Sequence, residues 1–328
     1  MKHTRNISLA LVIILMLGLG AACADPAMFD IDNPEDIVNP EDVAFDLSLE
    51  MIPLSEFPAV SAQMPKASGT LVKSNNKSVI DYSNTADGYV MVKWSAKTTK
   101  QLRVQVTGPS GTAYTYTLKA NDKFEVFPLS DGKGNYKINV LEQTEGTKYA
   151  AANSVQVNVT LKDEFAPFLR PNQYVNFKAD SKVVAKAAEL IKGKKTLTDK
   201  ITAVYNYVVK NFTYDKELAK TVKSGYLPDV DAVLAKKKGI CFDYAAVMAA
   251  MLRSQGVPTK LVVGYAGDVY HAWINVYSEQ TGWVNSAIFF DGKNWQLMDP
   301  TFESTSNNSS SFQQFIGDGK NYKTKYLY

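Results

Sequence analysis

Cysteine and histidine are the scarcest reactive residues of this 328-residue chain, which has two of each. The cysteines are Cys23, in an apolar N-terminal stretch, and Cys241. If that stretch is removed, Cys241 has no partner for an internal disulfide. A single unpaired thiol in an exported protein suggests that the thiol takes part in a reaction. His3 and His271 form no Cys/His cluster with zinc-ligand spacing, so we expect neither a metal nor another cofactor.

The chain also has little excess of charge of either sign. The chain has 36 basic and 33 acidic residues, a formal net charge of +3, and the loss of Lys2 and Arg5 with the N-terminal stretch brings it near neutrality. No basic stripe remains, so we do not expect nucleic acid as a partner. With 45% hydrophobic and 21% charged residues, the composition is that of a globular protein, and the length suffices for two domains.

Residues 1–24 have the pattern of an export signal. Two basic residues precede an apolar run at 7–19, and small residues follow at 20–24. The run is too short for a membrane span. Gly20-Ala21-Ala22-Cys23 resembles a bacterial lipobox in which Gly20 replaces the usual Leu, and this predicts a lipid anchor on Cys23. The alternative is ordinary cleavage next to Ala24 and simple secretion.

The following residues, 25–75, are acidic and rich in proline. Asn-Pro-Glu-Asp occurs twice, at 33–36 and 39–42, and three more prolines follow by position 65. Such a segment buries little apolar surface, so we expect a flexible tether between the anchor and the folded domains.

Period-two alternation marks residues 76–162 as a β-domain. Turn signals with glycine at 87–88, 108–111 and 131–134 separate the strands, and about seven strands predict an antiparallel sandwich of immunoglobulin-like type. No catalytic cluster occurs there, so both a spacer and a binding module stay open. The clearest alternating runs are 90–94, 102–106, 114–118, 136–140 and 155–159.

Residues 163–180 form a linker with two prolines, and the period then becomes helical in a domain at 181–328. Amphipathic helices are expected at 183–191 and at 197–208, the latter capped by Thr196. A loop at 215–228 and a short helix at 231–236 follow.

The next helix is expected to begin at Cys241 and to stop before Gly256. Unpaired N–H groups and the helix dipole at an N-terminus favour an anion, so we expect the pKa of this thiol to be lowered. Asp243 lies in the same first turn, where a carboxylate suits the dipole, and its expected role is that of a helix-start residue.

Three strands are expected after this helix, at 260–266, 271–277 and 295–299. His271 opens the second strand, and Asp299 closes the third. A cysteine at a helix N-terminus facing a sheet with a histidine and an aspartate provides a nucleophile, a general base and an orienting group.

The motifs resemble the transglutaminase-like core shared by many bacterial cysteine enzymes, over roughly residues 180–302. The resemblance implies a papain-like α+β fold with Cys241 as nucleophile, His271 as base and acid, and Asp299 as the orienting carboxylate. Trp273 is expected to be a packing residue. The motifs are Gly239–Ala245, Met251–Arg253, Gly256–Pro258, Tyr270–Trp273 and the stretch 295–302.

The oxyanion hole can be assigned only in part. The backbone N–H of Cys241 is one donor by position. Relatives often supply the second donor from an aromatic side chain upstream of the cysteine, and here Tyr214 and Tyr226 both qualify. The aromatic tail after Phe302 either packs back on the core or lines the substrate groove.

These features predict an extracytoplasmic enzyme that transfers acyl groups from amide bonds through a thioester. The expected substrate is protein or peptide, including cell-envelope material, and the expected acceptor is water, because no lid or second set of β-domains shelters the thioester. Crosslinking to a lysine amine is the first alternative. A noncatalytic surface binding protein is the second, although the complete triad argues against it.

Overall fold

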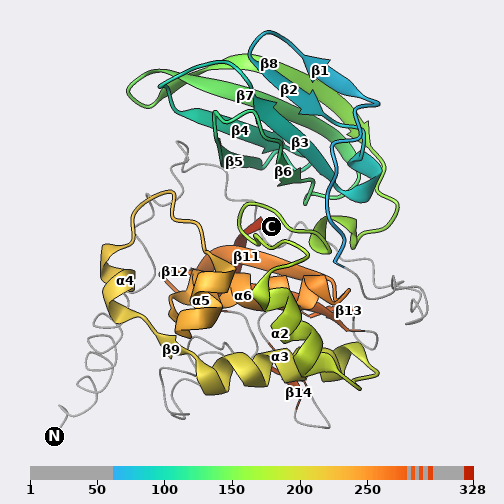
Figure 1. Ribbon diagram of the computed structural model, residues 1–328, viewed down its shortest axis with the longest axis vertical. Helices are drawn as coiled ribbons and strands as arrows, with labels where there is room; N and C mark the ends of the chain where they lie inside the picture. Colours follow the sequence, from blue (N-terminus) through green and yellow to red (C-terminus); the bar gives the residue numbers. More distant parts are fainter. Residues whose placement is uncertain (1–61, 279–281, 285–287, 291–294, 298–320) are drawn as a thin grey trace, which may run out of the picture.

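The computed structural model describes residues 62–278, 282–284, 288–290, 295–297 and 321–328. A β-rich part and a mixed α and β part lie one above the other, and residue 328 lies between them (Figure 1). Of the predicted site residues, Cys241 and His271 are described, whereas Asp299 lies outside these ranges.

The β-rich part consists of two four-stranded sheets. All neighbouring strands are antiparallel. The first sheet has the order β1 (Val72–Ser74), β2 (Ser78–Asp81), β3 (Tyr89–Trp94), β6 (Glu125–Pro128). The second has the order β5 (Ala113–Leu118), β4 (Leu102–Thr107), β7 (Gly134–Glu145), β8 (Lys148–Val159).

The alternating pattern of the sequence corresponds to half-buried strands, as predicted. In β4, Leu102, Val104 and Val106 are buried, while the residues between them are partly exposed. There are eight strands in this part rather than about seven, and β1 lies inside the stretch expected to be a tether. The immunoglobulin-like class and the domain boundaries stay predictions.

Helices form one side of the mixed part. Thr196 caps α3 by accepting a hydrogen bond from the Asp199 N–H, as the sequence predicted. The stretch expected as a loop contains α4, whose cap Asp215 accepts from the Leu218 N–H at 3.0 Å. None of the helices in the described ranges has the length and apolarity of a membrane span. The helices are α2 (Lys182–Ile191), α3 (Leu197–Asn211), α4 (Lys216–Thr221), α5 (Val230–Lys236) and α6 (Cys241–Ser254).

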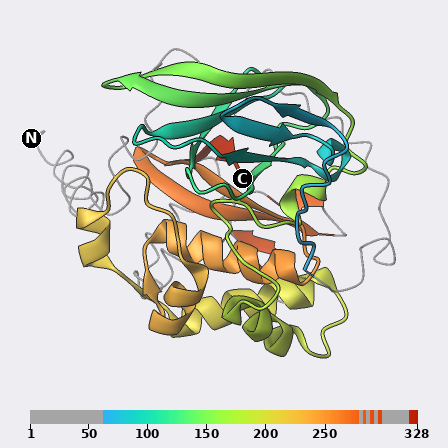
Figure 2. The same cartoon turned by 45° about the horizontal axis from the view of Figure 1, so that its top comes forward.

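An antiparallel sheet forms the other side, and it lies between α6 and the β-rich part (Figure 2). Its order is β13 (Gly282–Val284), β12 (Val269–Ser278), β11 (Thr259–Ala266), β16 (Tyr322–Leu327). Residues 322–327 of the tail thus pack on the core as strand β16. Two further pairs are β9 (Thr213–Tyr214) with β10 (Lys238–Gly239), and β14 (Ile288–Phe290) with β15 (Trp295–Leu297).

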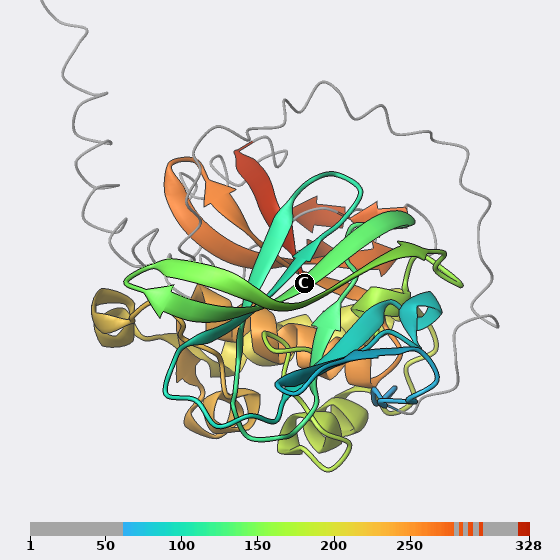
Figure 3. The ribbon, with the colours of Figure 1, turned by 90° about the horizontal axis from the view of Figure 1, so that it is seen from above.

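Aromatic residues join the two parts. The ring centroid of Tyr328 lies 5.8 Å from that of Tyr116 on β5 and 4.2 Å from that of Tyr174 in the linker. Tyr114 and Tyr326 form a similar edge contact at 5.5 Å. All five rings belong to one continuous buried core, and residue 328 lies near the centre when the molecule is seen from above (Figure 3).

Arg253 fixes the same junction from inside. Its side chain is 1% exposed and donates hydrogen bonds to the carbonyl oxygens of Thr259 and Arg170, both at 2.8 Å, and to that of Tyr328. Charged donors with several carbonyl acceptors tolerate burial because each acceptor offsets part of the lost hydration. One guanidinium at the end of α6 therefore joins the start of β11, the linker and the residue after β16 by hydrogen bonds.

Candidate active site

Cys241 is the first residue of α6, as predicted. It is 3% exposed, and Ile240 before it has an extended backbone with φ −95° and ψ 177°. The N–H groups of the first helical turn have no partners within the helix and point toward its N-terminus. The thiol therefore lies where the helix dipole favours a negative charge.

Asp243 anchors the turn that presents Cys241. One carboxylate oxygen accepts from the Ile240 N–H at 2.9 Å, and the other accepts from the Tyr226 hydroxyl at 2.7 Å. Burial raises the pKa of the Asp243 carboxyl, and these two hydrogen bonds act in the opposite direction. A Cβ on Gly239 would come within 2.6 Å of the Asp243 Cβ, so only glycine fits there. Asp243 thus has the helix-start role expected from the sequence.

His271 is the third residue of β12 rather than its first, because the strand begins at Val269. It pairs with Gly264 of β11 and is 2% exposed. Its ring stacks on Trp273 with centroids 6.1 Å apart, and Tyr322 lies 6.3 Å away on the strand beyond β11. The Trp273 indole N–H donates to the Asn275 side chain at 3.1 Å. Trp273 therefore packs beside the histidine, as expected.

Helix α6, which begins with Cys241, packs against β12, which holds His271, and against β11. Burial raises the pKa of the Tyr270 hydroxyl, and the negative charge of Cys241 is among the smaller contributions in the same direction. The charge of Cys241 thus acts on the residue that precedes His271.

Asp299 cannot be placed, because it lies outside the described residues. The strand that precedes it, β15, pairs with β14 and ends at Leu297. The triad as a whole therefore stays a prediction. Within the described part of the chain, no group of three or more His, Cys, Asp or Glu side chains is arranged to hold a metal ion.

The two candidates for the second oxyanion donor both lie beside the cysteine turn. Tyr214 is on β9 and pairs with Gly239, two residues before Cys241. Tyr226 donates its hydroxyl hydrogen to Asp243, and its ring lies 6.4 Å from Phe242. The bond between Tyr226 and Asp243 was missed from the sequence, because a separation of 17 residues in a loop carries no periodic signal.

Residues 184–300 match the family model of the transglutaminase-like superfamily core. This segment contains α6, β11 and β12, which carry the cysteine and the histidine. Residues 184–300 therefore form a transglutaminase-like core of mixed α and β structure, the fold class predicted from the sequence.

A curated relative resembles part of the chain. YebA of Bacillus subtilis (strain 168), which is itself uncharacterized, is 31% identical over 118 residues. The match covers 30% of this chain and 16% of YebA. The chain thus corresponds to a small part of that relative's length.

Three solved structures share weak overall likeness. A candidate cysteine protease from Cytophaga hutchinsonii is 17% identical with a TM-score of 0.33, covering 71% of this chain and 69% of its own. A candidate protease from Parabacteroides distasonis is 15% identical with a TM-score of 0.29, over 57% and 38%. Red sea bream transglutaminase is 14% identical with a TM-score of 0.29, over 67% and 48%. The family assignment rests on residues 184–300 alone.

Proposed function

We propose that this chain is a cysteine-dependent acyl-transfer enzyme that hydrolyses amide bonds in proteins or peptides, with Cys241 as its nucleophile. The observation that carries the proposal is the position of Cys241 at the N-terminus of α6, a helix packed against the strand that holds His271. A helix N-terminus stabilises the thiolate form, and a neighbouring imidazole can exchange a proton with the sulfur.

The proposed reaction has two steps. His271 takes the thiol proton, and the Cys241 sulfur attacks the carbonyl carbon of the amide. The carbon–sulfur bond forms, the carbon–nitrogen bond breaks, and His271 gives its proton to the leaving amine. Water then attacks the thioester, its proton passes through His271 to the sulfur, and a carboxylic acid is released. Asp299 holds the imidazole in the required orientation.

The oxyanion that forms in each step needs two donors. We assign one to the backbone N–H of Cys241. The second is Tyr214 or Tyr226, which both lie beside the cysteine turn, and the Tyr226 hydroxyl also donates to Asp243. Removal of the hydroxyl that serves as donor should lower kcat by about tenfold to a hundredfold with little change in KM, so Tyr214→Phe and Tyr226→Phe, measured side by side, identify the donor.

Peptide and protein libraries incubated with the full chain, with and without an added primary amine, test the reaction. Mass spectrometry should show cleavage products that gain the mass of water in the presence of wild-type protein and not with Cys241→Ala. Products that gain the amine in preference to water would replace hydrolysis by crosslinking. The absence of both products over a broad library would contradict the proposed activity.

We also propose that the enzyme acts outside the cytoplasm and is held at the cell surface by lipid on Cys23. The support is the lipobox-like sequence at 20–23 and the acidic, proline-rich stretch after it. Mass spectrometry of the mature N-terminus decides between the alternatives. An acylated Cys23 agrees with the proposal, whereas an unmodified Ala24 or Asp25 at the N-terminus means simple secretion.

A further inference from the structure

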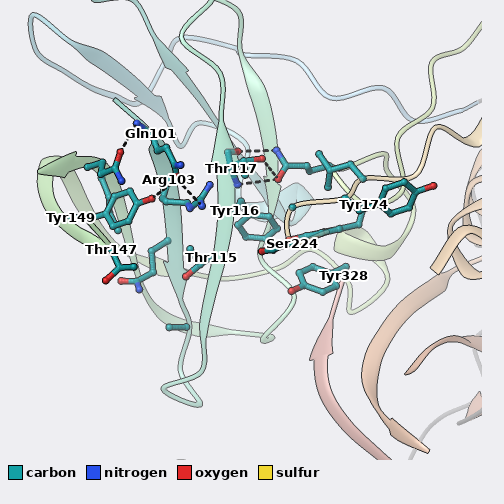
Figure 4. Close-up of a pocket in the computed structure, with 18 of the residues that line it drawn as sticks. Gln101, Arg103, Thr115, Tyr116, Thr117, Thr147, Tyr149, Tyr174, Ser224 and Tyr328 are labelled. Carbon is teal, nitrogen blue, oxygen red and sulfur yellow. Dashed lines mark hydrogen bonds between the residues drawn. The ribbon is translucent and has the colours of Figure 1, made fainter. Parts of the chain in front are cut away.

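A cleft of about 400 Å³ lies where the β-rich part meets the transglutaminase-like core. We name it the junction cleft. One wall is the outer face of the sheet β5-β4-β7-β8, with Arg103, Thr115 and Tyr149, and the other contains Tyr174, the loop 224–227 and Tyr328 (Figure 4). Its volume is in the range of ligand sites in proteins. Because it is built from both parts of the chain, neither part forms it alone.

Two residues that line the junction cleft, Tyr226 and Tyr174, contact residues next to the cysteine. Tyr226, in the loop that forms one wall, donates to Asp243, and Asp243 in turn accepts from the N–H of Ile240. Tyr174, on the same wall, has its ring centroid 5.7 Å from that of Phe242. A molecule in the cleft therefore lies against the side chains that hold the cysteine turn in place.

Arg103 is the one charged side chain among the described residues that line the cleft. One Nη atom donates to the Gln101 side-chain oxygen at 3.3 Å, and the Tyr149 hydroxyl donates to the same oxygen at 2.9 Å. The guanidinium lies over the Tyr149 ring, 5.7 Å from its centroid. These contacts hold it in position, which reduces the entropy that a ligand must offset on binding.

The Arg103 guanidinium has further N–H groups that can bind a ligand. It carries five N–H groups in a planar fork that matches a carboxylate. In the described part of the chain, no carboxylate forms an ion pair with Arg103. The neutral residues around it include Gln105, Thr115 and Gln143, whose side chains can both donate and accept hydrogen bonds, as peptide groups require.

The edge strand β5 does not offer its backbone at this point. The Gln173 side chain accepts from the Thr117 N–H at 3.1 Å and donates to the Thr117 carbonyl at 2.8 Å. At Thr117 a ligand therefore meets side chains and cannot extend the sheet as a further strand.

We propose that the junction cleft is a substrate subsite, in which Arg103 binds an acidic side chain of an extended peptide on its way to Cys241. This proposal rests on the proposed function, because it names the class of substrate that the cysteine acts on. In this proposal the β-rich part helps to select the substrate, in addition to covering the transglutaminase-like core. A peptide is favoured over a glycan because the proposed chemistry breaks amide bonds and the cleft provides a single fixed cation.

The test of selectivity uses the full chain and blocked peptides in pairs that differ only by Glu or Gln at one position, taken from library members that wild-type protein cleaves. Wild-type protein should prefer the Glu member at the best position by about tenfold in kcat/KM, since a charge-assisted pair is stronger than a neutral hydrogen bond; tenfold corresponds to about 1.4 kcal/mol. Arg103→Gln should bring the Glu to Gln ratio to about one, and Arg103→Lys should restore part of the preference.

Lys137→Gln is the matched control. Lys137 is an exposed cation on β7 of the same sheet, and it is not among the residues that line the cleft. If Lys137→Gln and Arg103→Gln lower the Glu to Gln ratio equally, bulk charge and not the cleft selects the peptide, and the proposal is wrong. It is equally wrong if wild-type protein shows no preference at any position, or if Arg103→Gln retains the preference.

A binding experiment distinguishes a failure of this proposal from a failure of the proposed function. In Cys241→Ala, a fluorescein-labelled Glu-containing peptide should bind with higher affinity than its Gln partner, and Arg103→Gln in that background should remove the difference. Binding selectivity without any turnover by wild-type protein would support the subsite and contradict the enzyme. Turnover without Arg103-dependent selectivity would support the enzyme and contradict the subsite. Preferential binding of neutral oligosaccharides would overturn the assignment of a peptide as the ligand.

Discussion

The Tyr226 hydroxyl donates a hydrogen bond to the Asp243 carboxylate at 2.7 Å, and this bond joins a surface loop to the helix turn that presents Cys241. The other oxygen of the same carboxylate accepts from the Ile240 N–H. One buried carboxylate thus connects the junction cleft with the backbone next to the thiol.

The first prediction concerns this pair. Tyr226→Phe and Asp243→Asn should each lower the free energy of unfolding by about 1 to 3 kcal/mol, because each leaves part of a buried hydrogen-bond network unpaired. In a double-mutant cycle followed by urea unfolding, the two changes should couple by at least about 0.5 kcal/mol. Strictly additive effects would mean that the bond contributes nothing to the stability of the cysteine turn.

The second prediction concerns Lys260, whose Nζ atom lies 3.8 Å from the centroid of the Trp283 ring and 5.0 Å from that of Phe168. Burial lowers the pKa of this amine from 10.5 to about 8, and Glu164 opposes the shift. Between these two pH values the unfolded chain holds a proton that the folded chain lacks. Stability therefore rises with pH in this window through Lys260, and the burial penalty is full below pH 8.

Lys260→Met should accordingly raise the free energy of unfolding at pH 7 by about 1 to 3 kcal/mol and remove this contribution to the rise above pH 8. Urea unfolding at pH 7 and pH 9.5 measures both effects. Lys137→Met, at an exposed position, should leave the pH dependence as it is in wild-type protein. A destabilised Lys260→Met at pH 7 would show that the contacts of the cation with the rings outweigh its burial.

The third prediction compares two buried tyrosines. The Tyr116 hydroxyl has no hydrogen-bond partner among the described residues. The Tyr136 hydroxyl accepts from the Asp131 N–H and donates to the Gly132 carbonyl, both at 2.9 Å. Tyr116→Phe should leave stability unchanged or raise it by up to about 1 kcal/mol, and Tyr136→Phe should lower it by about 1 to 2 kcal/mol. Thermal and urea unfolding provide the comparison, which fails if the two changes cost the same.

The fourth prediction ranks the proposed catalytic residues. His271→Ala should remove almost all turnover, because the other histidine of the chain, His3, lies in the stretch expected to be cleaved off. Asp299→Ala should retain more activity than His271→Ala, since a carboxylate that only orients the imidazole is less costly to lose. The measurement is kcat/KM for one peptide, with circular dichroism as the check on folding. A fully active Asp299→Ala would remove Asp299 from the triad.

Much of the core was predictable from the sequence, for identifiable reasons. Helices α2 and α3 carry complete amphipathic patterns, and Thr196 supplies a side-chain cap for α3. Helix α6 is buried along its whole length, and its bounds were predictable because it begins at Cys241 and ends at Ser254, two residues before Gly256. The positive φ of Gly256, 75°, is the left-handed conformation that ends helices.

Features that depend on contacts distant in sequence were not predictable. Strand β16 alternates weakly, and its place beside β11 depends on a pairing across about sixty residues. The junction cleft requires the sheet β5-β4-β7-β8, the linker, the loop 224–227 and Tyr328 to be placed together. Helix α4 was expected to be a loop because six residues carry too short a period, although its Asp215 cap was visible in the sequence.

The pH dependence of Cys241 alkylation by iodoacetamide, followed by peptide mapping, tests the central claim most directly. Cys241 is 3% exposed, so the reagent must reach the thiol through a restricted opening, and Cys241→Ala identifies any other labelled site. The account predicts that wild-type Cys241 is labelled with an apparent pKa well below the ordinary value of about 8.5, and that His271→Ala raises that pKa. An inert Cys241, or a titration near 8.5 that is the same in His271→Ala, would contradict its role as an activated nucleophile.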